Sequence, residues 1–98
     1  MNLNFRGIGY TPNDEDRDFL DKKLKKLAFA EDYLHDLDIV VNQESKGIGF
    51  HLDATLHFTW KKEKVVSQDA YELYEGIELL ADKIQSVAKK EKEKTMGI

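Results

Sequence analysis

The stretch FHLDATLHFTW, residues 50–60, decides the fold, because polar and apolar side chains alternate along all of it. One side of the alternation holds the apolar residues Leu52, Ala54, Leu56, Phe58 and Trp60. The other side holds the polar residues His51, Asp53, Thr55, His57 and Thr59. A repeat of two residues is the period of a β-strand. The pattern therefore predicts an antiparallel strand with one buried face and one solvated face.

Shorter alternating stretches lie on both sides of this central strand. Further strands are expected at residues 2–9, 37–42 and 64–68. In the first of them, Leu3, Phe5 and Ile8 are expected on the apolar face. Residues 45–47 and 61–63 combine Ser, Gly, Lys and Glu, and we expect turns there, before and after the central strand.

The segment that follows the first strand carries the signals of a helix start. Thr11 suits the N-cap, Pro12 suits the first helical position, and Asp14 suits a capping box. The apolar stripe of this helix consists of Phe19, Leu20, Leu24 and Leu27. These features predict a first helix at residues 12–28.

From residue 69 onward the apolar period changes from two residues to three or four. The new stripe contains Ala70, Leu73, Tyr74, Ile77, Leu80, Ala81, Ile84, Val87 and Ala88. This spacing predicts a long amphipathic helix at residues 68–94, with Tyr74 in the core.

The order of these elements predicts an α+β fold of the form β-α-β-β-β-α. We expect a four-stranded, mainly antiparallel sheet with two helices packed on one face, and with the histidine-bearing face open. The 98 residues suffice for one domain, which we expect at residues 1–95 with a short tail at 96–98.

Composition excludes several classes of protein. The chain has no cysteine, which rules out a disulfide scaffold, a thiolate zinc site and a cysteine nucleophile. It has no long apolar run, so no signal peptide or membrane anchor is expected. A soluble protein of the cytoplasm is the expectation from these features.

The charges are segregated along the chain, although the net charge is −4. The lysines gather in three clusters, which are Lys22, Lys23, Lys25 and Lys26, then Lys61, Lys62 and Lys64, then Lys83, Lys89, Lys90, Lys92 and Lys94. With their intervening glutamates these clusters sum to +9, which leaves −13 on the remainder. Segregated charge produces a field with a direction, and such a field favours a polyanionic partner on one side of the molecule.

A helical wheel sorts these lysines further. Lys83, Lys90 and Lys94 fall within about 40° of one another, and Lys23 and Lys26 lie about 60° apart. If the helices lie side by side, these rows are expected to line one groove or ridge suited to a phosphate backbone. Lysines near helix ends also serve solubility and complement the helix dipole, and the pattern alone leaves both interpretations open.

The residues resemble the ribosome hibernation promoting factor family, also called ribosomal subunit interface or sigma-54 modulation proteins. That family has a strand with the motif A-T-L-H, and DATLHF at 53–58 matches it. The family also has a helix with the motif D-M-Y-x-A-I-D-x-L-x-D-K-L, and ELYEGIELLADKI at 72–84 corresponds to it. Its first-helix pattern, R-x-x-V-x-x-R-L-x-K-L, is answered by Arg17, Leu20, Lys23, Leu24, Lys26 and Leu27. The opening MNLNFRG is similar to M-x-L-N-I-x-G. The chain differs at Ser86, where the family has an arginine, and at 60–64, where WKKEK replaces a tight turn.

The resemblance implies a translation inhibitor that binds the small ribosomal subunit in the tRNA and mRNA channel and promotes hibernation under stress. Basic residues of the two helices would contact 16S rRNA near ribosomal proteins. By position these are Lys23, Lys26, Lys83, Lys90 and Lys94. The resemblance implies no cofactor, no membrane and no small-molecule substrate. The chain ends after the second helix and so resembles the short members.

Two other functions remain as alternatives. One is a protein-interaction module of the same fold that does not bind RNA, with the sheet face as its contact surface. The other is a general binder of double-stranded RNA, because sheets covered by two helices recur in such proteins.

Catalysis and metal binding are not expected. No nucleophile elbow and no glycine-rich phosphate loop occurs in the sequence. His51 and His57 would stand about 20 Å apart along a strand, too far for one ion. His57 is expected on the solvated face, where it is hydrogen-bonded or touches a partner. His35 is expected in a surface loop, and Trp60 is expected to cap the sheet as a core residue.

Overall fold

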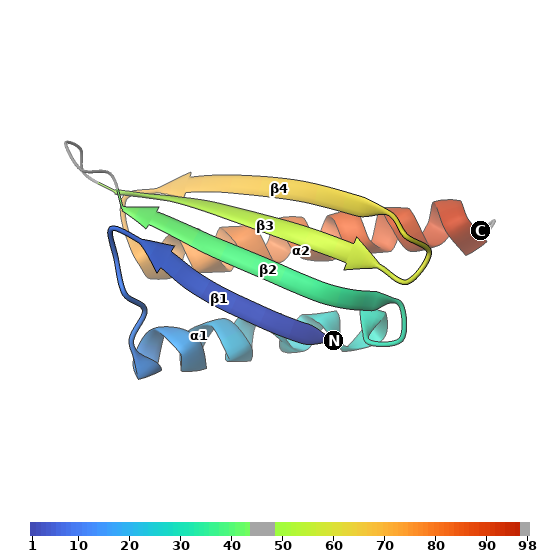
Figure 1. Cartoon of the computed structure of the whole chain (residues 1–98), viewed down its shortest axis with the longest axis horizontal. Coiled ribbons are helices and arrows are strands. Elements are labelled where there is room, and N and C mark those ends of the chain that lie inside the picture. The colour runs from blue at the N-terminus through green and yellow to red at the C-terminus, as the bar shows by residue number, and fades with distance from the viewer. Residues whose placement is uncertain (44–48, 97–98) are drawn as a thin grey trace.

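The structure is a computed structural model that describes residues 1–43 and 49–96 (Figure 1). Its elements are β1 (Asn2–Ile8), α1 (Asp14–Leu24), the 3-10 helix η1 (Lys25–Ala30), β2 (Leu34–Gln43), β3 (Phe50–Phe58), β4 (Glu63–Ala70) and α2 (Leu73–Met96). The predicted order β-α-β-β-β-α is confirmed, with η1 added after α1. The turn expected at 45–47 and residues 97–98 of the expected tail lie outside the described residues.

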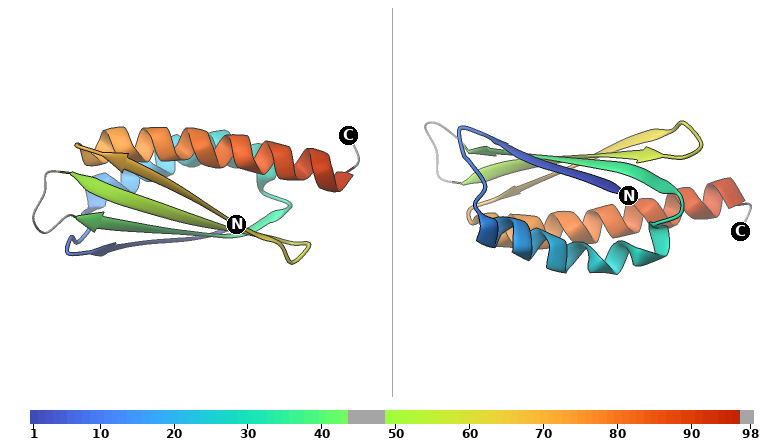
Figure 2. Two further views of the ribbon diagram at one scale, coloured as in Figure 1. Left: turned by 90° about the horizontal axis from the view of Figure 1, so that it is seen from above. Right: turned by 60° about the horizontal axis from the view of Figure 1, so that its bottom comes forward.

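The four strands form one sheet in the order β1-β2-β3-β4. β1 runs parallel to β2, and the two other pairs are antiparallel, so the sheet is mixed but mainly antiparallel, as predicted. Both helices cover the same face of the sheet (Figure 2). They also run in the same direction, towards the end where β3 turns into β4 (Figure 1). Because the molecule is 45 Å long and at most 23 Å across, its two ends are distinct surfaces.

The core lies between the sheet and the helices. Most of its largest fully buried side chains come from predicted apolar positions, namely Leu20, Leu27, Leu37, Ile39, Val41, Leu52, Leu56, Ile77, Leu80 and Ile84, and Leu34 and Glu91 join them. Burial of each such side chain stabilises the fold by about 1.5–3 kcal/mol. Ile8, expected on this face, is 53% exposed. An even-numbered residue of β1 points away from the side that Leu3 and Phe5 occupy.

The first helix begins two residues later than predicted. Its N-cap is Asn13, whose Oδ1 accepts a hydrogen bond from the N–H of Asp16 at 2.8 Å. The Asp16 carboxylate in turn accepts from the N–H of Asn13 at 3.0 Å, which completes a capping box. Asp16 also accepts a hydrogen bond from the Tyr10 hydroxyl, and burial raises the pKa of Tyr10 to about 12. This network fixes the start of α1, so Thr11 is not the cap.

Substitution of Asn13 by Ala is expected to lower the free energy of unfolding by about 1 kcal/mol, since it removes the cap of α1. Urea denaturation followed by circular dichroism measures this loss. Thr11→Ala is the matched control, because Thr11 is exposed and lies outside the capping box. An equal loss in both variants would contradict the assignment of the cap.

The second helix also begins later than predicted. Residues 68–70 belong to β4, where Gln68 pairs with Leu52 and Ala70 pairs with Phe50. Ala70 fits the helical period by spacing, but pairing with β3 continues to this point and keeps the chain extended. The helix starts at Leu73 and ends at Met96.

Candidate nucleic-acid interface

α2 presents the row formed by Lys83, Lys90 and Lys94 on the flank that borders β4. The Nζ atom of Lys83 donates a hydrogen bond to the backbone carbonyl of Ser67 in β4 at 2.8 Å. Lys90 and Lys94 are exposed and follow Lys83 along the same side of the helix. The predicted row therefore lies on one side of α2, and its first member, Lys83, contacts the edge strand β4.

Lys23 and Lys26 lie on the opposite flank of α2, where α1 and η1 pack against it. Lys23 Nζ is 3.2 Å from Glu78 Oε1, and Lys26 Nζ is 2.5 Å from Asp82 Oδ1. Both carboxylates belong to α2, so these ion pairs connect the two helices. The structure thus does not bring all five candidate lysines into one groove, because the exposed side of α2 separates the two rows.

Lys89 and Lys92 point away from the row of Lys83 and contact aromatic rings. Lys89 Nζ lies 5.7 Å from the centre of the Phe29 ring, and Lys92 Nζ lies 5.4 Å from that of Tyr33. Cation–π contacts of this kind contribute about 0.5–1 kcal/mol at exposed sites. These two lysines therefore help to hold α2 against η1 and the segment before β2.

Glu91 is a charged residue in the core, and sequence reasoning missed its role. Its side chain is 3% exposed, with Lys62 Nζ 3.0 Å from Oε2 and Lys64 Nζ 3.4 Å from Oε1. The ammonium group of Lys62, paired with this carboxylate, holds the pKa of Glu91 below its ordinary value. A signal was present, since Glu91 follows Ile84 by seven residues and so continues the apolar stripe of α2.

The open face of the sheet is acidic. Its carboxylates are Asp36, Asp38, Asp53, Glu63 and Asp69. His57 hydrogen-bonds to Asp38 at 3.1 Å, which confirms the expectation for this residue. His51 hydrogen-bonds to Asp69 at 2.5 Å, and this bond holds the pKa of His51 above its ordinary value. Within residues 1–43 and 49–96, no group of three potential ligands is placed to hold a metal ion.

Because the two helices run in the same direction, acidic residues and lysines collect towards opposite ends of the molecule. Acidic residues load the first turns of both helices, and lysines load the last turns of α2 and the segment of α1 that leads into η1. The β3–β4 turn lies at the same end as the last turns of α2 (Figure 1). We call this end the basic end, and its lysines are Lys61, Lys62, Lys64, Lys89, Lys90, Lys92 and Lys94. Clusters that are remote in sequence thus converge in space.

Comparison with protein-family models identifies the family of the chain. The model described as "Sigma 54 modulation protein / S30EA ribosomal protein" matches residues 3–96. The chain belongs to this family. The resemblance noted from the sequence is thereby confirmed. No curated protein sequence matches the chain.

Two solved structures share the fold of this S30EA-family chain. A ribosomal subunit interface protein from Coxiella burnetii superposes with a TM-score of 0.83 at 18% identity, over 94% of this chain and 98% of that one. The N-terminal domain of Protein Y from Thermus thermophilus gives a TM-score of 0.78 at 21% identity, over 92% and 98%. At these identities the likeness establishes the α+β architecture.

Three aromatic and histidine residues of this S30EA-family chain differ from their predicted positions. Tyr74 is 38% exposed and stacks on Phe19 with ring centres 4.3 Å apart, so it bridges the helices and is not in the core. Trp60 is half-buried and stacks on Phe58 at 4.9 Å, at the margin of the core. His35 lies in β2 rather than in a loop, because β2 begins at Leu34.

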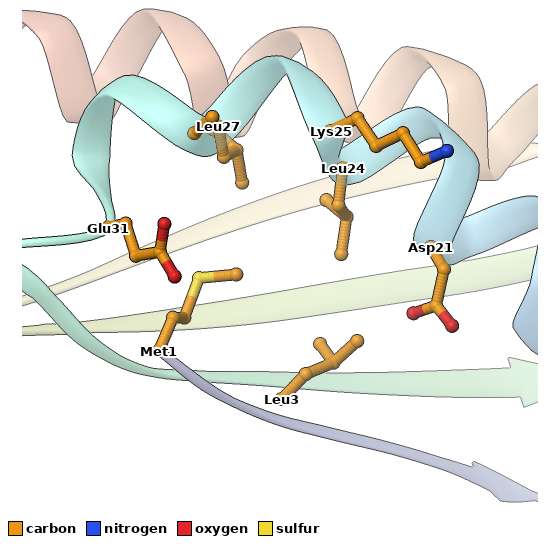
Figure 3. A pocket seen from close by; sticks show the side chains of 8 residues that line it. Met1, Leu3, Asp21, Leu24, Lys25, Leu27 and Glu31 are labelled. Atoms are coloured by element: carbon orange, nitrogen blue, oxygen red, sulfur yellow. The ribbon is translucent and has the colours of Figure 1, made fainter.

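The cavity in Figure 3 lies between β1 and the α1–η1 segment and has a volume of about 450 Å³. Its lining is mainly apolar, and its charged residues are two carboxylates, Asp21 and Glu31, and one lysine, Lys25. The five candidate lysines are not among its lining residues. It is therefore not part of the candidate interface.

Among the described elements, no helix has the length and apolar character needed to span a membrane.

Proposed function

We propose that this chain is a ribosome-associated inhibitor of translation. It binds the small subunit in the channel used by tRNA and mRNA and promotes ribosome hibernation under stress. The observation that carries this proposal is the family match over residues 3–96. The segregated charge supports it, because the lysines that a phosphate backbone requires lie apart from the acidic sheet face.

The proposed mechanism is steric. Lys83, Lys90 and Lys94 contact the phosphate backbone of 16S rRNA from one flank of α2, and Lys23 and Lys26 contribute from the other flank. The ammonium groups of Lys23 and Lys26 remain accessible to RNA, although they pair with Glu78 and Asp82. The side chains of the two lysines are 27% and 29% exposed. The acidic sheet face points away from RNA and limits indiscriminate binding. The body of the protein then fills the decoding channel, and no bond is made or broken.

The partners follow from this mechanism. They are 16S rRNA and the ribosomal proteins that border the channel, which places the protein in the cytoplasm. The chain acts as a binding factor rather than an enzyme, and it uses no cofactor, membrane or small-molecule substrate.

Co-sedimentation with purified 30S and 70S particles across a salt series tests the proposal. Stoichiometric pelleting at low salt is expected. The logarithm of the binding constant should fall linearly with the logarithm of salt concentration, by about 0.7–0.9 for each phosphate contact. Absence from the pellet at low salt would refute ribosome binding.

A protein-interaction module of the same fold is the second candidate. It is favoured by the ion pairs of Lys23 and Lys26, which reduce the charge available to RNA, and by the open acidic sheet. This candidate predicts that the protein stays in the supernatant with ribosomes at every salt concentration. The sedimentation experiment therefore separates the two.

A further inference from the structure

The turn between β3 and β4 is held by backbone hydrogen bonds and carries lysines. The N–H of Phe58 donates to the carbonyl of Lys62 at 2.9 Å, and the N–H of Lys61 donates to the carbonyl of Phe58 at 3.1 Å. The N–H of Thr59 donates to the carbonyl of Tyr33 at 2.9 Å, which ties the turn to the segment before β2. A turn with this many backbone bonds presents its side chains in defined directions.

Lys61 occupies a position that favours glycine. Its φ is 61°, in the left-handed region, where a side chain with a Cβ atom is strained. The lysine is exposed, so packing in the core does not account for the choice of residue. Strained residues that packing does not explain cluster at functional sites.

The buried carboxylate of Glu91 joins this turn to α2. Because it pairs with both Lys62 and Lys64, it places the turn against the part of the helix that carries Lys90 and Lys94. The side chains of Lys62 and Lys64 remain 44% and 39% exposed. Each ammonium has three donors, so one can bind Glu91 while another reaches a phosphate oxygen.

We propose that the β3–β4 turn and the end of α2 form one binding site for the phosphate backbone of RNA. We call it the hairpin–helix patch, and its residues are Lys61, Lys62, Lys64, Lys90 and Lys94. The patch extends the site of the proposed function, on which this inference rests, by adding lysines from the sheet to those of the helices. Glu91 is a positioning residue, since it orders two of the lysines from beneath the surface.

Charge and preorganisation both favour a polyanion at this patch. Residues 61–64 and 90–94 together hold six lysines and three glutamates, which leaves a net charge of +3. Two of the lysines are already held by Glu91, so ordering them on RNA costs less conformational entropy than ordering free side chains. Trp60, the single tryptophan of the chain, is half-buried beside Lys61 and provides a spectroscopic probe of the patch.

Lys61→Gly tests the patch, because glycine relieves the left-handed backbone while it removes the charge. The fold is expected to be retained, which urea denaturation checks. Lys22→Gln is the matched control, since it changes the net charge equally at an exposed position of α1. Affinity for 30S particles is measured by co-sedimentation, and affinity for a synthetic RNA stem–loop by the fluorescence of Trp60.

At about 0.1 M salt, Lys61→Gly is expected to weaken binding to 30S particles about five- to eight-fold and to lower the salt slope by about 0.7–0.9, as the loss of one phosphate contact requires. Lys22→Gln should change affinity less than two-fold. Equal effects of the two variants, with 30S binding intact, would overturn the patch and leave the proposed function standing.

If the wild-type protein does not bind ribosomes, titration with the synthetic RNA stem–loop tests the hairpin–helix patch by itself. A change in Trp60 fluorescence on RNA titration that Lys61→Gly weakens would then support the patch without the proposed function. Titration curves that coincide for wild type and Lys61→Gly would reject it.

Discussion

Reversing the charge of Lys83 and Lys90 together is expected to abolish binding of the protein to the small ribosomal subunit at physiological salt. Each lost phosphate contact weakens binding about five- to eight-fold at 0.1 M salt, so two contacts account for about 25- to 60-fold. The two new glutamates add repulsion from the RNA backbone. Co-sedimentation of Lys83→Glu/Lys90→Glu with 30S particles across a salt series measures both the loss and the change in slope.

The effect of this double variant on folding should be small. Lys83 donates one exposed hydrogen bond to the carbonyl of Ser67, and its loss costs about 0.5–1.5 kcal/mol. Lys90 is exposed. A urea denaturation curve with an unchanged slope would show that the fold is intact.

Lys89→Glu/Lys92→Glu is the matched control for this double variant. It makes the same change in net charge on the same helix, but on the flank where Lys89 and Lys92 contact Phe29 and Tyr33. It should reduce ribosome binding much less than Lys83→Glu/Lys90→Glu does. If both double variants bind alike, long-range charge alone accounts for binding, and the row of Lys83 is not the contact surface.

The elements of the fold were predictable because burial imposes a period on the sequence. Alternation in β3 continues through Leu52 and Leu56, both fully buried, and the spacing of Ile77 and Ile84 gave α2 its buried stripe. The ends of the helices were less predictable. Thr11 and Asn13 are both good caps by type, and only the contact with Asp16 decides between them.

The candidate site was predictable in composition but not in arrangement. A helical wheel gives angles about one helix axis, and so it grouped Lys83 with Lys90 correctly. It does not say which neighbour lies on each flank, so it missed that α1 packs beside Glu78 and that β4 borders Lys83. The partners of Glu91 lie more than 25 residues away in sequence, and a periodic pattern carries no information about such pairs.

Removing both partners of Glu91 is expected to destabilise the protein by about 3 kcal/mol, because an unpaired carboxylate would be left in the core. Lys62→Met/Lys64→Met keeps the aliphatic part of each side chain and removes the charge. For a domain of this size the melting temperature should fall by more than about 10 °C. Calorimetry and urea denaturation at neutral pH measure the loss.

The loss should also depend on pH in a defined direction. In the wild type the pKa of Glu91 is held below its ordinary value of 4.5, so its contribution to stability is complete above that pH and is lost as the pH falls through the lowered pKa. In Lys62→Met/Lys64→Met, burial without a partner raises the pKa of Glu91 above 4.5, so the buried group is neutral in acid and costly at neutral pH. The difference in free energy of unfolding between wild type and variant should therefore shrink as the pH falls from 7 to 4.

A companion variant separates the charge of Glu91 from the packing around it. Adding Glu91→Leu to Lys62→Met/Lys64→Met removes the buried charge together with its partners, and replacing a whole buried ion pair by apolar residues is often neutral or stabilising. Stability is then expected to return to near the wild-type value and to lose the pH dependence that the wild-type pair contributes. If the triple variant were as unstable as the double, or if the deficit of the double variant were constant from pH 7 to 4, the lysines would be stabilising the fold by packing and not by pairing with Glu91. In that case the rigid connection between the β3–β4 turn and α2 would need another cause.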